Sequence, residues 1–280
     1  MTYLQAVILG LVQGLAEFLP ISSSGHLAIL EYFFGIKEDS VLLYAVLLHF
    51  GTLIAVFVCF WKDIVELVKE LFITIADLVK GRRLRLEERP VRKLGVMIII
   101  SCIPTAIIGF LFGDVFEGMY SKPVVIACMF IVTGIMLIIA ENIGTGHRTI
   151  ENMNVRNALF IGIVQGIAII PGISRSGSTL FSSLLVQLDR AFAVKYVFLI
   201  SIPTILGSVI LELPDGIKSG MAGAGWGPII VGVLVSFLCG LFAIKIMLRI
   251  VQNRKLKYFS YYLFVIAAVI IIINVFSFIK

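Results

Sequence analysis

The sequence is poor in charged residues. Asp, Glu, Lys and Arg make up 14% of its 280 residues, whereas 60% are hydrophobic. A soluble domain usually has about one-quarter charged residues. The mean hydropathy is +1.08, and several apolar runs reach the roughly 20 residues that a helix needs to cross a bilayer. The composition therefore argues against a soluble domain and predicts a polytopic membrane protein.

Cysteine is scarce as well. Its four copies, Cys59, Cys102, Cys128 and Cys239, all lie in apolar runs, without the spacing of a zinc site or a disulfide framework. We interpret them as small packing residues. The N-terminus lacks a basic leading region and a cleavage site, so we expect no removed signal peptide and insertion through the first hydrophobic segment.

The apolar runs predict two kinds of membrane segment. Full spans are expected at 41–61, 94–113, 123–141, 192–213, 227–248 and 258–279. Near residues 1–34 and 158–188 the apolar pieces are too short to span, and polar stretches with Pro and Gly divide them. We expect re-entrant helix pairs there, because irregular backbone at membrane depth must be covered by protein or face a watery cavity. Residues 62–75 predict an amphipathic helix at the membrane surface.

The two broken regions repeat one another. Residues 3–26 align without a gap on 155–178, and ten of the 24 pairs are identical, including Gln-Gly and Ser-x-Ser-Gly in register. Three spans follow each re-entrant pair, and three is odd, so the second copy is expected upside down. The predicted fold is one all-α membrane domain, 1–280, with an inverted repeat of about 1–141 and about 155–280.

The positive residues are distributed unevenly between the predicted loops. If 62–93 is cytoplasmic, the cytoplasmic loops hold 17 Lys and Arg, and the outer side holds only Lys37, Lys122, Lys218 and Lys280. This asymmetry follows the positive-inside rule and predicts that both termini face outward. The formal net charge of +6 is thus explained by topology, and we expect no nucleic-acid partner.

Arg175 is the most unusual residue of the second polar stretch, because an intramembrane arginine is costly and is commonly functional. Its planar fork of donors fits phosphate oxygens. The neighbours that would add hydroxyl or backbone N–H donors are Gly172, Ser174, Ser176, Gly177, Ser178 and Thr179. The helix after Gly177 would point its positive end at the same place. The alternative is a structural counter-ion for Glu17.

The first polar stretch holds acidic, amide, hydroxyl and imidazole groups. Gln13 and Glu17 share one helix face, and their oxygens could hold Mg²⁺ or Ca²⁺, or position a water. Alternatively, Gln13 packs and Glu17 pairs with Arg175. His26 or Ser23 could attack phosphorus, with His26 also suited to acid–base work. The residues do not choose between these two nucleophiles.

The remaining two histidines have no comparable surroundings. His49 lies in a predicted span and His147 in a basic loop, and we expect neither to be catalytic.

Two motifs resemble the undecaprenyl-diphosphate phosphatases, also called bacitracin-resistance proteins. They are Gln13-x-x-x-Glu17 followed by Phe18-Leu19-Pro20-Ile21-Ser22-Ser23-Ser24-Gly25-His26, and Pro171-Gly172-Ile173-Ser174-Arg175-Ser176-Gly177-Ser178-Thr179. The resemblance covers essentially the whole chain. It implies an enzyme of the bacterial cytoplasmic membrane that removes the terminal phosphate of undecaprenyl diphosphate, recycles the carrier lipid for cell-wall synthesis and protects against bacitracin.

The resemblance also implies roles for particular residues. The family's functional positions fall on Gln13, Glu17, Ser23, His26 and Arg175, and a divalent cation is expected. Gln at position 13, where the family can have Glu, is a weaker metal ligand. Phosphate binding is expected from Arg175 with Ser174, Ser176, Gly177 and Thr179. We keep a homodimer as an assembly to test.

Two other functions are weighed against the phosphatase. Inverted repeats with broken helices also build transporters, so a lipid flippase or anion transporter is the alternative. Transport alone does not need Ser23 and His26, and a structural scaffold needs neither Arg175 nor Glu17. The phosphatase hypothesis requires the two polar tips to meet, with Arg175 near Glu17 and His26.

Overall fold

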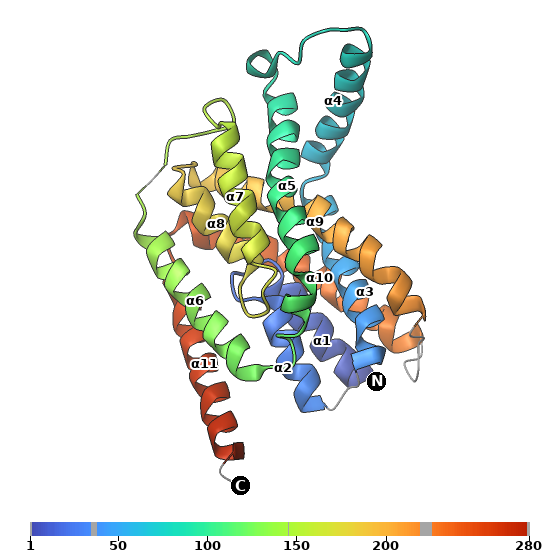
Figure 1. The fold of residues 1–280 in the computed structure, drawn as a ribbon, viewed down its shortest axis with the longest axis vertical. Helices are drawn as coiled ribbons and strands as arrows, with labels where there is room; N and C mark the ends of the chain where they lie inside the picture. Colours follow the sequence, from blue (N-terminus) through green and yellow to red (C-terminus); the bar gives the residue numbers. More distant parts are fainter. Residues whose placement is uncertain (1, 35–37, 145, 219–225, 279–280) are drawn as a thin grey trace.

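The structure is a computed structural model that describes residues 2–34, 38–144, 146–218 and 226–278. Its described part is helical, with one short 3-10 turn and no strand. The helices are α1 (Tyr3–Ala16), α2 (Ser23–Phe34), α3 (Glu38–Cys59), α4 (Trp61–Val79), α5 (Pro90–Glu117), α6 (Pro123–Asn142), α7 (Val155–Ile167), α8 (Arg175–Leu185), α9 (Arg190–Lys218), α10 (Trp226–Gln252) and α11 (Lys257–Phe278). Figure 1 shows their arrangement.

The all-helical, polytopic membrane fold is confirmed. Five described helices are long and apolar enough to cross a membrane, or six if α3 and α4 form one bent span. Each predicted span corresponds to one helix, with ends that differ by a few residues. Lys37 and Lys280 lie outside the described residues, as does the side chain of Lys218, and the outward direction of the termini stays a prediction.

The predicted amphipathic helix is α4, which turns by 86° from α3 and runs beside the first half of α5 (Figure 1). Its face toward α5 carries carboxylates. Arg92 of α5 binds Glu70 through Nε and Asp77 through Nη2, both at 2.8 Å. Leu71 and Phe72 are exposed. The ion pairs therefore lie inside the α4–α5 hairpin, and Leu71 and Phe72 lie outside it.

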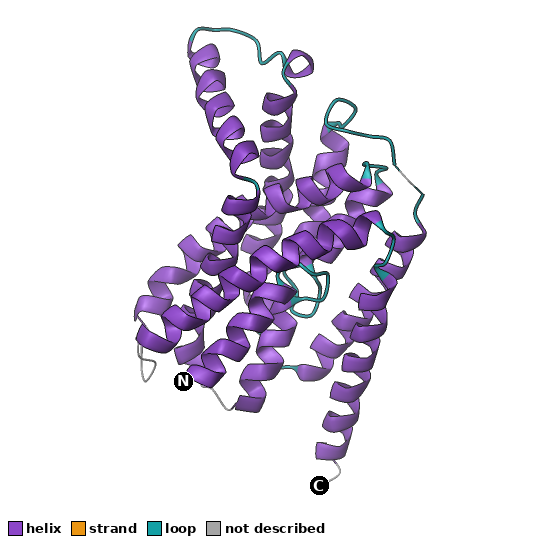
Figure 2. Cartoon of the chain, turned by 180° about the vertical axis from the view of Figure 1, so that it is seen from behind, coloured by secondary structure: helices purple, strands orange, loops and turns teal. Residues whose placement is uncertain are grey.

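The two broken regions have the same local structure. Thr2 and Gln5 form a capping box at the start of α1, and Asn154 and Asn157, at the equivalent repeat positions, form one at the start of α7. Figure 2 shows the loops that join α1 to α2 and α7 to α8 in the middle of the bundle, where the polar stretches lie. The inverted orientation of the two copies stays a prediction.

Equivalent glycines seat both of these helices against long spans. A side chain at Gly10 would meet the backbone of Gly232 in α10, and one at Gly162 would meet the backbone of Ser101 in α5. Ser101 also donates a 2.9 Å hydrogen bond to the carbonyl of Ala158. Backbones approach this closely in membranes where small residues line the interface.

We expect Gly162→Ala to lower the thermal stability of the purified protein clearly, because the new methyl group must push α7 off α5. Gly113→Ala is the matched control: Gly113 also lies in a helix, and nothing lies within 4 Å of the place that its new methyl group would take. There the substitution should be neutral or slightly stabilising. Thermal unfolding in detergent measures both, and equal melting temperatures would contradict the close packing.

Candidate active site

The first hairpin places Glu17 and Ser23 on opposite sides of a tight turn. Glu17 caps the C-terminal end of α1, and Pro20 prevents the helix from continuing. Ser22 then adopts a left-handed conformation with φ of 68°, which is unfavourable for a residue with a side chain. Its hydroxyl accepts from the N–H of Gly25 at 3.3 Å, so α2 begins at Ser23.

The second hairpin uses the same cap. Ser174 accepts from the N–H of Gly177 at 3.1 Å, and α8 begins at Arg175. The expectation that the helix starts only after Gly177 is therefore wrong by three residues, since α8 starts at Arg175. Gly172 adopts a φ of 94°, which glycine tolerates, and so forms the turn before Ser174. Ser174 can then cap the helix.

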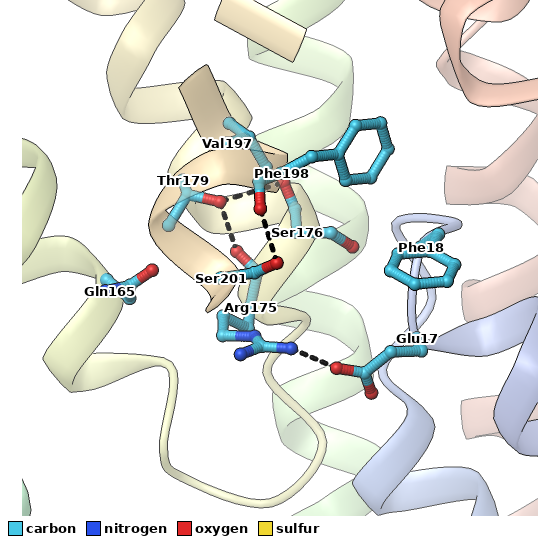
Figure 3. A pocket seen from close by; sticks show the side chains of 9 residues that line it. All are labelled: Glu17, Phe18, Gln165, Arg175, Ser176, Thr179, Val197, Phe198 and Ser201. Carbon is cyan, nitrogen blue, oxygen red and sulfur yellow. Dashed lines mark hydrogen bonds and ion pairs between the residues drawn. The ribbon is translucent and has the colours of Figure 1, made fainter. Parts of the chain in front are cut away.

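Two of the hydroxyl groups expected around a phosphate, those of Ser176 and Thr179, bind backbone carbonyls in this structure. Ser176 donates to the carbonyl of Leu19 at 3.2 Å and thereby joins the second hairpin to the first. Thr179 donates to the carbonyl of Arg175 at 2.7 Å. Both side chains line the pocket beside Arg175 (Figure 3). Their hydrogen bonds stabilise the backbone of the two hairpins.

The two hairpins meet at the carboxylate of Glu17, which is 5% exposed. Arg175 donates from Nη2 to Oε1, as Figure 3 shows. Ser23 donates from Oγ to Oε2 at 2.7 Å. Ser23 and Arg175 are equivalent in the repeat, since each is the first residue of its helix. Equivalent positions of the two copies thus bind the two oxygens of one carboxylate.

Three more side chains complete this cluster. Gln13 donates to Oε2 of Glu17 at 3.0 Å, and Thr204 of α9 accepts from Nη1 of Arg175 at 2.9 Å. His49 of α3 places Nε2 at 3.7 Å from the same Glu17 oxygen. Thr204 was not predicted, and His49 was not expected to be catalytic, because neither belongs to a polar stretch. Only the packing of α3 and α9 against the hairpins brings them here.

His26 lies beside a different set of groups. Its Nδ1 is 2.8 Å from the carbonyl of Ser22, and its Nε2 is 2.8 Å from the hydroxyl of Tyr262 in α11. The meeting of Arg175 with Glu17 was predicted, whereas both nitrogens of His26 are engaged away from that ion pair. Tyr262 has no motif around it and was missed.

The groups around Glu17 offer few ligands for a divalent cation. Within the described part of the chain, no three His, Cys, Asp or Glu side chains gather to hold a metal. Gln13, however, is fully buried, and its Oε1 finds no hydrogen-bond partner among the described residues. An oxygen of this kind next to a carboxylate suits a hard cation. Gln13 and Glu17 could supply some of the oxygen ligands of such a cation, and substrate oxygens would have to supply the others.

Fold and site together define an integral membrane protein with a buried polar centre, built where two broken helix pairs meet. The family model of the bacitracin resistance protein BacA matches residues 6–269. The chain belongs to this family.

Named relatives cover nearly the full length. An undecaprenyl-diphosphatase of Alkaliphilus metalliredigens is 44% identical over 274 residues, which is 98% of this chain and 99% of the relative. Another, of Halothermothrix orenii, is 40% identical over 273 residues, 98% of either chain. A third, of Thermosipho africanus, is 42% identical over 263 residues, 94% of this chain and 97% of the relative.

Proposed function

We propose that this protein is a membrane phosphatase that hydrolyses undecaprenyl diphosphate to undecaprenyl phosphate and inorganic phosphate. The product recycles the carrier lipid for cell-wall synthesis in the bacterial cytoplasmic membrane, and the activity confers bacitracin resistance. Membership of the family and the named relatives support this function. The carboxylate of Glu17, shared between Arg175 and Ser23, is the observation that carries the mechanism.

Substrate binding begins with an exchange of partners at Arg175. Its guanidinium is neutralised by Glu17 in the structure described here, so the diphosphate must take the place of that carboxylate oxygen. A planar guanidinium binds two phosphate oxygens as well as it binds a carboxylate. Since Ser23 binds the other oxygen of the same carboxylate, a phosphate group that replaces Oε1 arrives beside the Ser23 hydroxyl.

Ser23 is the proposed nucleophile. Its Oγ forms a bond to the terminal phosphorus while its proton passes to Oε2 of Glu17, 2.7 Å away. The bond between that phosphorus and the bridging oxygen breaks, and undecaprenyl phosphate leaves. Water then attacks the phosphoserine, the serine oxygen takes back a proton and inorganic phosphate departs. Gln13 keeps the carboxylate in place throughout.

Mg²⁺ or Ca²⁺ would be held by Gln13, Glu17 and diphosphate oxygens, and would neutralise phosphate charge. We propose that the two copies form an inverted repeat with the tips of both hairpins near mid-membrane, and that both termini face outward. We propose a homodimer as the assembly to be tested.

Release of phosphate and labelling of the enzyme test the function. Purified protein in detergent should release inorganic phosphate from undecaprenyl diphosphate, and substrate labelled on its terminal phosphate should leave label on Ser23 after rapid quenching. Ser23→Ala should lose both signals. Label on His26 would reassign the nucleophile, and label on neither would favour direct attack by water. Lipid movement across vesicles without phosphate release would favour the flippase.

A further inference from the structure

The hydrogen bonds of His26 define where its protons lie. The carbonyl of Ser22 can only accept, so Nδ1, 2.8 Å away, carries a hydrogen. In the neutral ring Nε2 then has a lone pair, and the hydroxyl of Tyr262 donates to it at 2.8 Å. The carbonyl that anchors Nδ1 belongs to Ser22, the left-handed residue that precedes α2. The imidazole is thus tied to the turn on one side and to Tyr262 on the other.

Tyr262 reaches His26 from a distant part of the fold. The two residues are 236 positions apart, and α11 packs mainly along α6. The rings of His26 and Tyr262 are parallel within 8°, with centroids 5.6 Å apart, and Phe130 of α6 lies 4.8 Å from the imidazole. The α6–α11 pair therefore holds this ring by one hydrogen bond and two ring contacts.

We infer that Tyr262 is a positioning residue of the reaction centre: through His26 it holds the first turn of α2, which carries Ser23. His26 and Ser23 are three residues apart and lie on neighbouring positions of that turn. A misplacement of about 1 Å at a reacting group can cost on the order of 10²-fold in rate. This inference rests on the proposed function of Ser23, and it adds a residue that no motif contains.

Tyr262→Phe tests the inference, because it removes the hydroxyl and keeps the ring. We expect kcat to fall roughly three- to tenfold, as for the loss of one neutral hydrogen bond, with KM nearly unchanged. Tyr261→Phe, on the neighbouring tyrosine, is the matched control and should keep full activity; Tyr261 is 55% exposed and Tyr262 is 40% exposed. Equal kcat values for the two variants would overturn the inference.

A double-substitution cycle with His26→Ala separates positioning from general stability. If Tyr262 acts through His26, Tyr262→Phe should reduce kcat no further once the imidazole is gone. Additive losses would overturn the inference. Ser23→Ala, measured in parallel, reports on the proposed function: an active Ser23→Ala variant overturns the nucleophile, whereas an inactive one beside a fully active Tyr262→Phe overturns only the role of Tyr262.

Histidine ¹⁵N resonances test the contact without turnover, and they decide the case if the double variant is too slow to measure. The chain has only three histidines, so His26 can be assigned by substitution. Wild-type protein should show hydrogen on Nδ1 and a hydrogen-bonded lone pair on Nε2. Tyr262→Phe should shift the Nε2 resonance, and Tyr261→Phe should leave it in place. An unchanged resonance in Tyr262→Phe would disprove the contact.

Discussion

Arg175→Ala should abolish phosphate release, with kcat/KM lower by roughly 10³-fold or more. Arg175 is the cation that reaches the carboxylate beside Ser23, so it is also the group that can hold the terminal phosphate there. Without it, the negative charge that develops in the transition state has no nearby partner from the second hairpin. Both kcat and KM should change, since the guanidinium contacts the substrate in the ground state and in the transition state.

The same substitution has a structural consequence that the experiment must separate. Glu17 is almost fully buried, and removal of its partner leaves a buried charge, which can cost about 3–5 kcal/mol of stability. Arg175→Lys keeps the charge without the planar fork and should fold normally, yet recover only part of the activity. Arg156→Ala, on an exposed arginine of α7, is the control for a lost positive charge. Full activity of a well-folded Arg175→Ala would remove this residue from the mechanism.

Glu17→Gln should lower kcat by roughly 10²- to 10⁴-fold while the enzyme binds diphosphate more tightly. Glutamine has nearly the same shape, and it cannot take the proton of Ser23, which lies 2.7 Å from Oε2. It also no longer neutralises Arg175, so the diphosphate does not have to displace a competing carboxylate. Steady-state kinetics should therefore show both kcat and KM falling, whereas Arg175→Ala, which removes a contact to the substrate, should raise KM.

This pattern also distinguishes the two roles considered for Glu17. If the carboxylate mainly holds a divalent cation, Glu17→Gln should raise KM and increase the cation concentration that is needed for half-maximal activity. Gln13→Ala is a useful comparison, because it removes the unpartnered oxygen and leaves the carboxylate in place. A kcat that stays at the wild-type level in Glu17→Gln would contradict its role as the base for Ser23.

The residues of the centre were easier to predict than their contacts. Glu17, Ser23 and Arg175 stand out because each is a polar group in a stretch where an apolar residue would be expected. The repeat also predicted that the two polar stretches meet. It did not predict that Ser23 and Arg175 would bind the two oxygens of one carboxylate, because that depends on where each helix starts. The start of α8 is determined by Ser174, which caps the helix, so that α8 already begins at Arg175 and includes Gly177.

His49, Thr204 and Tyr262 mark what could not be predicted. They lie on α3, α9 and α11, helices whose sequences are nearly uniform in apolar character, so no local pattern separates them from residues that face lipid. The hydrogen-bond partners of His26 were missed for the same reason. A histidine next to three serines indicates chemistry, and only the neighbouring helix determines which groups its two nitrogens bind.

The amino-acid sequence by itself determined that this is a helical membrane protein, where its spans lie and which two polar stretches form the candidate site, because hydrophobicity and helix breakers act over short distances along the chain. The tertiary structure alone decided which oxygen of Glu17 each hairpin binds, that His49 and Thr204 lie beside this cluster, and that Tyr262 holds His26. Such contacts depend on helix rotation and depth to within a few ångströms, and packing between distant segments determines both.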